Sequence, residues 1–455
     1  MTELHLSRSI LDEIRDSKAN KIKIAASDID GILRGKYIHK DKFFSAAKSG
    51  FGFCSVIFGW DCNDACYDKG SLTGLHNGYP DVDAFIDLST YRRVPWDDNV
   101  PFFLADFADP SGKHFGGCPR SVLKRVLAKA DSMGVRPFFG AEFEWFNFKE
   151  TPESLREKAF VNPTPITPGM FGYSILRPNM NKEYFAALMD EMQQFGIPIE
   201  GLHTETGPGV LEAALVYSDA LEAADRAVLF KTAAKEIAQR FGITASFMAR
   251  WSNDLPGCGG HLHQSLWDVQ NKNNLFFDAN DPLNMSETFK HYLAGQQRLM
   301  PDLLLMYAPN INSYKRLVEG YWAPTTATWG VDNRTTAIRV INGSAKSTRM
   351  ETRVSGSDIN PYLAIAAALA SGLWGIENKI PLTEPCKGNA YEDVKATPLA
   401  RNLGEAVNKF ESSDFTRELF GAEFVKHFAH TRRWEWKQYQ QRVTTYERER
   451  YFEII

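Results

Sequence analysis

Three short stretches of the sequence carry polar residues at every second position, with mostly apolar residues between them. This alternation places the polar side chains on one face of a β-strand. The three polar sets are Glu142 and Glu144; His261, His263 and Ser265; and Arg349, Glu351 and Arg353. The solvated edge of an antiparallel sheet explains any one of these strands, whereas all three together favour a shared functional site.

Two further carboxylates flank a tight turn in the string HTETGPGVLE. Gly207-Pro208-Gly209 can reverse the chain there and return Glu212 towards Glu205. Carboxylates held close together repel unless a cation lies between them, although an ordinary surface turn fits the same string. A second glycine-rich run, 257–260, precedes His261 and would let the backbone approach a ligand or simply form a turn.

Together these strings supply five carboxylates and an imidazole that could bind divalent cations. The candidate metal ligands are Glu142, Glu144, Glu205, Glu212, His261 and Glu351. Such oxygen-rich sets suit Mg²⁺ or Mn²⁺ better than Zn²⁺, and five negative charges require two or more ions. Nearby arginines, which bind phosphates and carboxylates, are Arg316, Arg334, Arg339, Arg349 and Arg353. Metals with arginines predict phosphoryl transfer, although the sequence has no GxxxxGK[ST] phosphate loop and no kinase signature.

The secondary-structure pattern predicts two closely associated domains that would position these residues. Helices are expected over residues 7–18, 120–134, 181–196 and 218–242, and strands over 21–26 and 33–39. A further extended run is expected over residues 50–60. We therefore expect a small mixed α/β domain over residues 1–105 and a catalytic domain over residues 106–455.

The composition of the 455-residue chain is that of a globular protein, with 44% apolar residues and a net charge of −4. This charge favours neither nucleic acid nor an anionic membrane as a partner. The charged N-terminus lacks the apolar stretch of a secretory signal, and the longest apolar run, 362–376, is too short to span a bilayer. The six cysteines form no regular framework, so free thiols and a cytoplasmic location are expected.

Six strings resemble ordered motifs of the glutamine synthetase family, most closely its γ-glutamylamide synthetase branch. They are GAEFEWF, HTETGPGVLE, GGHLHQSLWD, NSYKRLVEGYWAPT, WGVDNRTTAIRV and RMETRVSGSDINPYLAIAAALASG. They span most of residues 120–375, and the string DIDGILRGKY resembles the small domain of that family. The resemblance implies an α+β fold, in which an N-terminal β-grasp domain precedes a catalytic domain of curved antiparallel sheet and flanking helices. It also implies a homo-oligomer, a hexameric ring or a stacked dodecamer, with active sites between subunits.

The resemblance further implies a two-step reaction, in which ATP phosphorylates the γ-carboxylate of glutamate and an amine then displaces the phosphate. Glu144, Glu205 and Glu212 match ligands of a metal near the amine and glutamate, whereas Glu142, His261 and Glu351 match ligands of a metal at the nucleotide phosphates. Arg316 and Gly257 match contacts to the α-carboxylate and amino group of glutamate, and Arg353 matches the residue that holds the γ-carboxylate. Arg334, Arg339 and Arg349 match phosphate contacts, and His263 and Ser265 match the glutamate and nucleotide pocket.

Two departures from the family pattern concern the amine. Phe53 aligns with the aspartate that binds ammonium, and Trp322, in the string GYWAP, replaces the flap glutamate that closes the ammonium site. Ammonium requires carboxylates, whereas an alkyl or aryl amine suits apolar and aromatic walls. The acceptor is therefore predicted to be a small organic amine, a monoamine rather than a polyamine. Asp61 and Asp64 could supply acidic contacts to a polyamine, or one of them could serve as the base. A shifted register would instead put Ser55 or Asp61 at the position assigned to Phe53.

Other interpretations stay open at this point. An ordinary glutamine synthetase with a rearranged ammonium site, or a catalytically silent homologue, would share the same motifs. Pro256 and Arg250 replace residues that are common near the family's glutamate pocket, which leaves open whether the first substrate is unmodified glutamate. Tyr391 resembles the position at which some relatives are nucleotidylated.

Overall fold

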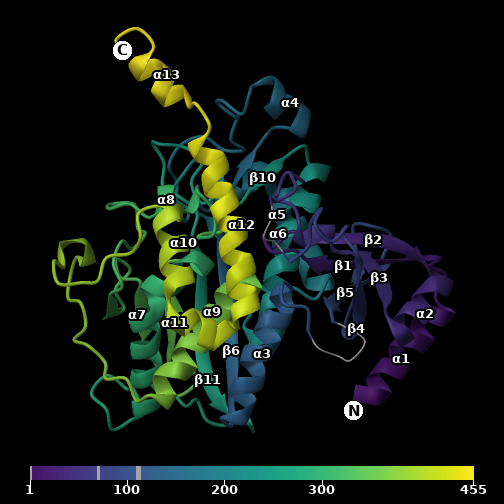
Figure 1. Cartoon of the computed structure of the whole chain (residues 1–455), viewed down its shortest axis with the longest axis horizontal. Coiled ribbons are helices and arrows are strands. Elements are labelled where there is room, and N and C mark those ends of the chain that lie inside the picture. Colours follow the sequence, from purple (N-terminus) through teal and green to yellow (C-terminus); the bar gives the residue numbers. More distant parts are fainter. Residues whose placement is uncertain (1–2, 69–71, 109–113) are drawn as a thin grey trace.

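The computed structural model describes residues 3–68, 72–108 and 114–455, with side chains from residue 8 onward. Within this part of the chain the strands form two sheets. A five-stranded sheet comes from the N-terminal region, and a nine-stranded sheet runs through the rest. Figure 1 shows the N-terminal sheet, coloured purple to blue, beside the larger body.

The N-terminal sheet is mixed, with the strand order β2-β1-β5-β4-β3. Its region contains α1 (Glu3–Asp16), β1 (Lys21–Ser27), β2 (Leu33–His39), α2 (Lys40–Ser49), β3 (Phe51–Cys54), the 3-10 turn η1 (Ser55–Phe58), β4 (Asp81–Val94) and β5 (Val100–Phe107). Strands β1 and β5 pair in parallel, and the other pairs are antiparallel. On one face, Ile22 and Phe103 pack with the apolar sides of α1 and α2. On the other face, Ala25 and Phe102 join the core of the larger body, as does Ile29 from the loop after β1.

The nine-stranded sheet is antiparallel except between β12 and β13. Its strands are β6 (Val135–Phe148), β7 (Ile199–Thr204), β8 (Val210–Leu215), β9 (Ser218–Asp219), β10 (Thr244–Ser246), β11 (Gly260–Asp268), β12 (Trp329–Val331), β13 (Ile338–Ile341) and β14 (Arg349–Thr352). Seven strands follow the order β12-β13-β14-β11-β6-β8-β7, while β9 and β10 pair with β6. The two long strands β6 and β11 are neighbours, and both carry charged alternations noted in the sequence.

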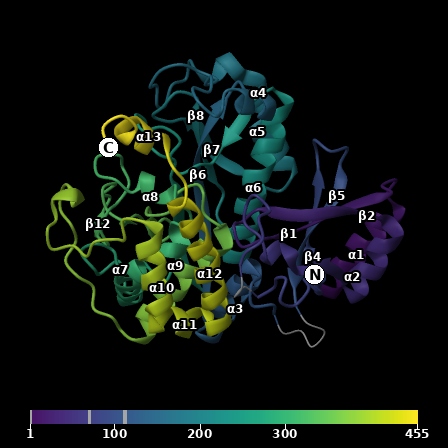
Figure 2. The ribbon, with the colours of Figure 1, turned by 45° about the horizontal axis from the view of Figure 1, so that its top comes forward.

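Helices form much of the rest of this part of the chain, and some of them contact strands of the sheet. They are α3 (Pro119–Ser132), α4 (Pro152–Glu157), α5 (Lys182–Gln194), α6 (Ala220–Arg240), α7 (Glu287–Tyr307), α8 (Ser313–Arg316), α9 (Pro361–Glu377), α10 (Leu403–Ser412), α11 (Asp414–Phe420), α12 (Ala422–Gln440) and α13 (Thr445–Tyr451), with 3-10 turns η2 (Pro178–Asn181) and η3 (Ala390–Glu392). Helix α9 contacts α3, α6 and α7, and α10 packs between α7 and α12. Figure 2 shows α10, α11 and α12 together, with α13 leading to the C-terminus.

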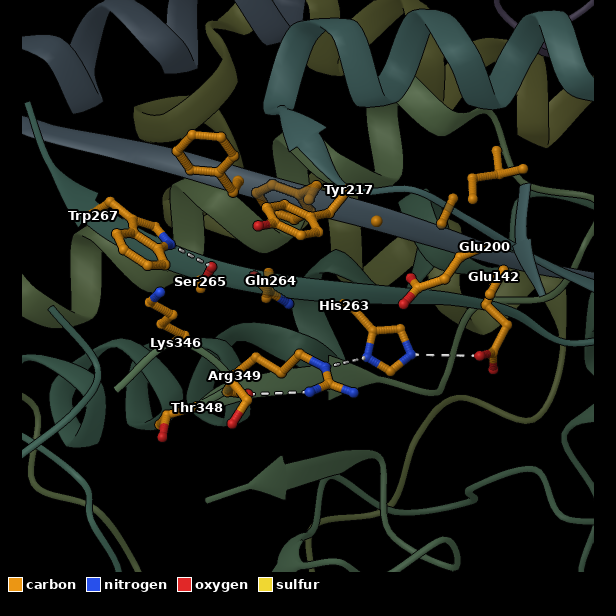
Figure 3. Close-up of a pocket in the computed structure, with 17 residues that line it drawn as sticks. Glu142, Glu200, Tyr217, His263, Gln264, Ser265, Trp267, Lys346, Thr348 and Arg349 are labelled. Atoms are coloured by element: carbon orange, nitrogen blue, oxygen red, sulfur yellow. Dashed lines mark hydrogen bonds and ion pairs between the residues drawn. The ribbon is translucent and has the colours of Figure 1, made fainter. Parts of the chain in front are cut away.

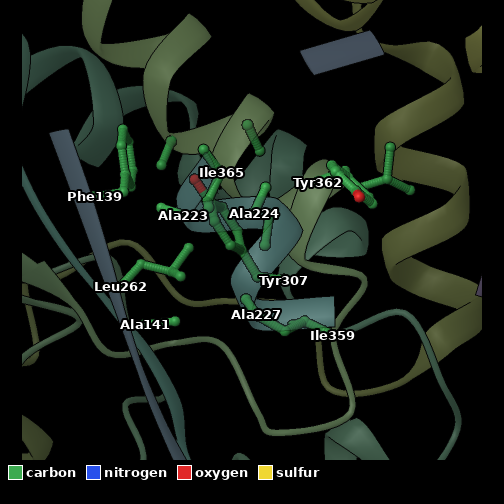
Figure 4. Close-up of a cluster of buried hydrophobic side chains, with 14 of the residues drawn as sticks. Phe139, Ala141, Ala223, Ala224, Ala227, Leu262, Tyr307, Ile359, Tyr362 and Ile365 are labelled. Carbon is green, nitrogen blue, oxygen red and sulfur yellow. The ribbon is translucent and has the colours of Figure 1, made fainter. Parts of the chain in front are cut away.

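An alanine-rich core joins these helices to the sheet. Helix α9 is apolar and buried through most of its length, because α3, α6 and α7 surround it. Gly375 of α9 lies so close to Gly295 of α7 that a Cβ on either residue would lie 2.6 Å from the Cα of the other. Figure 4 shows Phe139 and Leu262, from the inner face of the sheet, beside the alanines of α6. This packing leaves the opposite face of the long strands free for a site.

Most elements predicted from the sequence are present. The four predicted helices correspond to α1, α3, α5 and α6, and the strands over 21–26 and 33–39 correspond to β1 and β2. The extended run predicted over 50–60 is wrong beyond Cys54, because the chain turns into η1 and the buried Ser55 hydroxyl lies 2.7 Å from the Thr73 hydroxyl. All six cysteines are free thiols. Within the described residues, no helix has both the length and the apolar character needed to cross a membrane.

Candidate active site

The sheet register brings the predicted polar residues into adjacent rows on one face. Arg339 of β13 lies opposite Glu351 of β14, which lies opposite His263 of β11. In the next row, His261 of β11 lies opposite Glu142 of β6. The alternation noted in the sequence therefore produces one charged surface across four neighbouring strands.

A third row completes the carboxylate cluster. Glu144 of β6 lies opposite Glu212 of β8, and Glu212 lies opposite His203 of β7. The hairpin between β7 and β8 contains Gly207-Pro208-Gly209, and Glu205 at its start lines the same cavity as Glu212. The tight turn thus brings the two glutamates to one site, as the sequence indicated.

All six predicted metal ligands line one cavity of about 430 Å³, which we call the carboxylate cavity. Its walls also contain the predicted residues Gly257, Arg316, Trp322, Arg334, Arg339 and Arg353. Tyr173 and Tyr321 add two further aromatic rings. The cavity therefore combines groups that suit cations, groups that suit phosphate or carboxylate, and a surface that suits an organic group.

A second cavity, also of about 430 Å³, shares Glu142 with the first. Figure 3 shows His263 between Glu142 and Arg349. The Nε2 of His263 lies 3.6 Å from the Glu142 carboxylate. The Nδ1 of His263 accepts a hydrogen bond from the Arg349 Nε at 3.3 Å, and Ser265 accepts one from the Trp267 Nε1 at 3.0 Å. Ser265 and Arg349, which were predicted to contact the nucleotide, thus lie in this second cavity next to the carboxylate cavity.

Two arginines contact Glu351 in the carboxylate cavity, and one of them, Arg353, is buried. Arg353 forms an ion pair with one oxygen of Glu351, and Arg339 donates to the other at 2.9 Å. Arg316 is also buried, and its guanidinium donates to the carbonyls of Val354 and Arg353 at 3.1 and 3.2 Å. These contacts hold Glu351 and Arg316 in defined positions, which a site for small anionic substrates requires.

Several carboxylates of the cavity lie close enough to raise one another's pKa. Burial and the charges of Glu205 and Glu142 raise the pKa of Glu144 to about 6. Burial and the charges of Glu142 and Glu144 likewise raise the pKa of Glu212 to about 7. The hydrogen bond to Glu212 raises the pKa of His203 to about 9. Repulsion among grouped carboxylates is relieved when a cation binds between them.

The donor atoms fit divalent cations that prefer oxygen ligands. Among the described residues, ligand atoms of Glu142, His263 and Glu351 all lie within 4.8 Å of one another. The Nδ1 of His261 is 3.0 Å from Glu142 and 3.4 Å from Glu351. Burial and the Arg353 charge lower the pKa of His261, which favours the neutral ring that binds metals. The structure thus adds His263 to the predicted set, and the residues fit Mg²⁺ or Mn²⁺.

Glycine is required where the backbone passes beside this cluster. A Cβ on Gly257 would lie 2.3 Å from a carbonyl oxygen and 2.8 Å from the Arg316 side chain. A Cβ on Gly259 would lie 2.4 Å from His261, and the Gly259 N–H donates to Glu144 at 2.7 Å. The glycine-rich run therefore permits the backbone to pass close to side chains of the site, while a contact to a ligand stays a prediction.

Two residues predicted for the amine site lie away from both cavities. Phe53 belongs to the core of the N-terminal sheet, where its ring centroid is 5.7 Å from that of Phe107. Asp61 lies in a loop, where its carboxylate accepts the N–H groups of Asn63 and Ala65. Neither residue lines this chain's own carboxylate cavity. The register of the amine-site segment stays a prediction.

Trp322 lies at the rim of the carboxylate cavity and is 61% exposed. Its backbone has φ 60°, a left-handed conformation that is rare for a bulky residue. Beside it, the Tyr321 ring lies 4.4 Å from the Arg250 guanidinium, and the Ala323 carbonyl accepts the Tyr391 hydroxyl at 3.0 Å. The segment is thus held on both sides of Trp322, while the indole stays free to meet a ligand.

Two further residues of the site were not predicted from the sequence. His203 lies 3.0 Å from Glu212 and stacks on Tyr173, with ring centroids 4.4 Å apart. The period-two spacing of His203 and Glu205 could have indicated the histidine. Tyr173 comes from a loop whose sequence shows no periodicity, so no local pattern marks it.

The fold and site define an enzyme in which an antiparallel sheet holds clustered carboxylates and arginines for charge-stabilised group transfer. The family model described as the glutamine synthetase catalytic domain matches residues 116–451. The chain therefore belongs to the glutamine synthetase family, and it is an ATP-dependent ligase that forms carbon–nitrogen bonds.

Relatives resemble the chain over nearly its full length. Type-1 glutamine synthetase 2 of Dictyostelium discoideum is 53% identical over 98% of this chain and 86% of its own. Glutamate–isopropylamine ligase of a Pseudomonas species is 37% identical over 98% of both chains. Gamma-glutamylethanolamide synthetase of Streptomyces coelicolor is 35% identical over 95% of this chain and 92% of its own. A solved GmaS/ADP complex superposes with a TM-score of 0.85 at 29% identity, covering 97% of this chain and 99% of the other.

Glu144→Gln should separate metal binding from folding. The neutral amide removes like-charge repulsion, so the metal-free variant should unfold at a higher temperature than the wild type. Mg²⁺ should stabilise the wild type by about 2.7 kcal/mol at 100 times its Kd, and the variant by much less. Thermal unfolding with and without the ion measures both effects.

The matched control for this experiment is Glu150→Gln. Glu150 is buried, but it pairs with Lys158 and lines neither cavity. This variant should keep the wild-type response to Mg²⁺. An equally unchanged response in Glu144→Gln would show that Glu144 is not a ligand.

Proposed function

We propose that this ligase phosphorylates the γ-carboxylate of glutamate with ATP and joins the acyl phosphate to a small organic amine, which yields a γ-glutamylamide. We propose an organic amine rather than ammonia because of Trp322. Its indole stands at the rim of the carboxylate cavity, where closure over ammonium would require a carboxylate. Tyr173 and Tyr321 extend the aromatic surface, which suits an alkyl or aryl group.

The buried arginines support glutamate and ATP as the other substrates. Arg316 would bind the α-carboxylate of glutamate, and Arg353, beside Glu351, would hold the γ-carboxylate as it is phosphorylated. Arg334 and Arg339 line the same cavity and would contact the transferred phosphoryl group. Bound Mg²⁺ or Mn²⁺ would supply further neutralisation of the phosphate charge.

The second step needs a base and the exclusion of water. As the amine nitrogen attacks the acyl carbon, phosphate leaves and the nitrogen loses a proton. Glu205 lines the cavity and provides a carboxylate that can accept this proton. Trp322 would cover the acyl phosphate and protect it from hydrolysis.

The names of the relatives support two kinds of nitrogen donor, an organic amine and ammonia. The names of two relatives specify an isopropylamine ligase and an ethanolamide synthetase, which favours an organic amine. The relative at 53% identity is named a glutamine synthetase, which favours ammonia as the second candidate. The side chain at position 322 decides our choice, because an indole provides no negative charge for ammonium.

We also propose that residues 1–105 form a β-grasp domain, that residues 106–455 form the catalytic domain, and that the enzyme is cytoplasmic. The parallel pairing of β1 with β5 beside α2 supports the β-grasp assignment. We propose a homo-oligomer, a hexameric ring or a stacked dodecamer, in which Phe53 and Asp61 would approach a neighbouring subunit's cavity. Apolar residues exposed near the C-terminus support such contacts; they are Val443, Phe452, Ile454 and Ile455.

An amine panel tests the proposed function. Phosphate release is measured with ATP, Mg²⁺, glutamate and, in turn, ammonium, methylamine, isopropylamine, ethanolamine, benzylamine and putrescine. The kcat/KM for the best monoamine should exceed that for ammonium by at least about tenfold. Equal turnover of ammonium would indicate an ordinary glutamine synthetase, and no glutamate-dependent turnover with any amine would indicate a silent homologue.

Tyr391→Phe should weaken amine binding through the segment that carries Trp322. The variant loses one hydrogen bond to the Ala323 carbonyl, so the KM for the amine should rise about threefold to tenfold. The KM values for ATP and glutamate should not change. Initial rates at saturating ATP and glutamate measure the effect, and an unchanged KM for the amine would show that Tyr391 does not support this segment.

A further inference from the structure

A buried arginine, Arg432, connects the N-terminal sheet to the segment that carries Arg316. Arg432 belongs to α12 and is 2% exposed. Its guanidinium forms an ion pair with Asp30, in the loop between β1 and β2. The same guanidinium donates to the Pro309 carbonyl at 3.2 Å, so one side chain bonds two distant parts of the fold.

The loop that carries Asp30 is packed closely against the larger body. The buried carboxylate of Asp28 accepts the N–H groups of Asp30 and Ile32 at 3.0 and 2.9 Å. Gly31 has φ 79°, and a Cβ there would lie 3.0 Å from the Cα of Asn360. The Asn360 side chain also donates to the Asp28 carbonyl at 3.2 Å. The string DIDGILRGKY therefore provides a fixed anchor for Arg432.

From Arg432, hydrogen bonds lead to the start of α8. Asn310 follows the bonded carbonyl, and its side chain donates to the Asp358 carboxylate at 3.0 Å. Ser313, the first residue of α8, donates to the same oxygen at 2.6 Å. Arg316 is the last residue of this four-residue helix. The position of Ser313 therefore sets the position of Arg316, because both belong to the same short helix.

A second side chain of α12 holds the same segment. Glu435 accepts the N–H of Ile311 at 3.1 Å, and its other oxygen lies 3.5 Å from Arg432. Helix α12 thus contacts the chain before α8 through both a cation and an anion. Because Arg432 is buried and Glu435 is partly buried, their hydrogen bonds restrict movement more than fully exposed ones would.

We infer that Arg432 is a positioning residue for Arg316, because it holds the start of α8 against the anchored loop at Asp30. This inference rests on the proposed function, in which Arg316 binds the α-carboxylate of glutamate. A guanidinium suits this position because its planar fork can bond two partners at once, whereas an ammonium is a single compact charge. Displacement of Arg316 should therefore weaken glutamate binding and leave ATP binding unchanged.

Arg432→Lys tests the inference, because lysine keeps the positive charge but lacks the planar guanidinium that bonds two partners. The KM for glutamate should rise about tenfold, while kcat and the KM for ATP stay within about twofold of the wild type. Arg92→Lys is the matched control. Arg92 is a buried arginine of the N-terminal sheet that donates to Thr90 and to Glu222 of α6. It should leave the KM for glutamate unchanged, because these bonds lead away from α8.

Asn310→Ala is a second variant. If Arg432→Lys fails to fold, Asn310→Ala tests whether these hydrogen bonds position Arg316. It retains the pair between Arg432 and Asp30 and removes the side-chain bond to Asp358, so the same glutamate-specific rise in KM is expected. The inference is overturned if the folded variants raise the KM for glutamate and ATP alike, or change neither. If the wild type shows no glutamate-dependent phosphate release, the proposed function fails instead, and this role of Arg316 fails with it.

Discussion

Glu351→Gln is expected to lower kcat by about 10³-fold while the protein stays folded. Glu351 is buried, with one oxygen paired to Arg353 and the other 2.9 Å from Arg339. It also belongs, with Glu142 and His263, to the group whose ligand atoms lie within 4.8 Å of one another. The amide keeps the volume and a hydrogen-bond acceptor, but it lacks the negative charge that a divalent cation requires.

The measurement is the steady-state rate of phosphate release over a range of Mg²⁺ concentrations. The variant should need far more Mg²⁺ than the wild type for any activity, and its thermal unfolding without the ion should be cooperative. The Glu150→Gln control should retain normal rates, because Glu150 lines neither cavity. A folded Glu351→Gln enzyme with more than about a tenth of the wild-type kcat would contradict a metal site at this position.

Trp322→Glu is expected to reverse the preference for the amine. The substitution places a carboxylate at the rim of the carboxylate cavity and removes the aromatic surface there. The kcat/KM for the preferred monoamine should fall about 100-fold, and that for ammonium should rise about tenfold. Both values come from the amine panel, measured at saturating ATP and glutamate.

Trp322→Ala separates the two causes of this reversal. It removes the indole without adding a charge, so it should weaken the organic amine but give no gain with ammonium. If both substitutions alter the two amines equally, Trp322 has no role in choosing between them. An organic amine would then no longer be favoured over ammonium as the acceptor.

Local periodicity along the chain predicted several of the side chains that line the carboxylate cavity. The spacing of Glu142 with Glu144, and of His261 with His263, places each pair on one face of a strand wherever that strand lies in the fold. The glycines beside His261 indicated a close approach for a similarly local reason. Charge type then indicated the chemistry, because clustered carboxylates require cations and arginines bind anions.

The remaining features depend on contacts between residues far apart in the chain, which no local pattern specifies. Strand register set Glu144 opposite Glu212 and brought His203 beside them. Packing of the N-terminal sheet placed Phe53 in the core of that sheet, outside this chain's own carboxylate cavity. The bonds from Arg432 to Asp30 likewise join segments that approach only when the two parts of the fold assemble. Such contacts depend on the packing free energy of the whole molecule, so they became visible only in three dimensions.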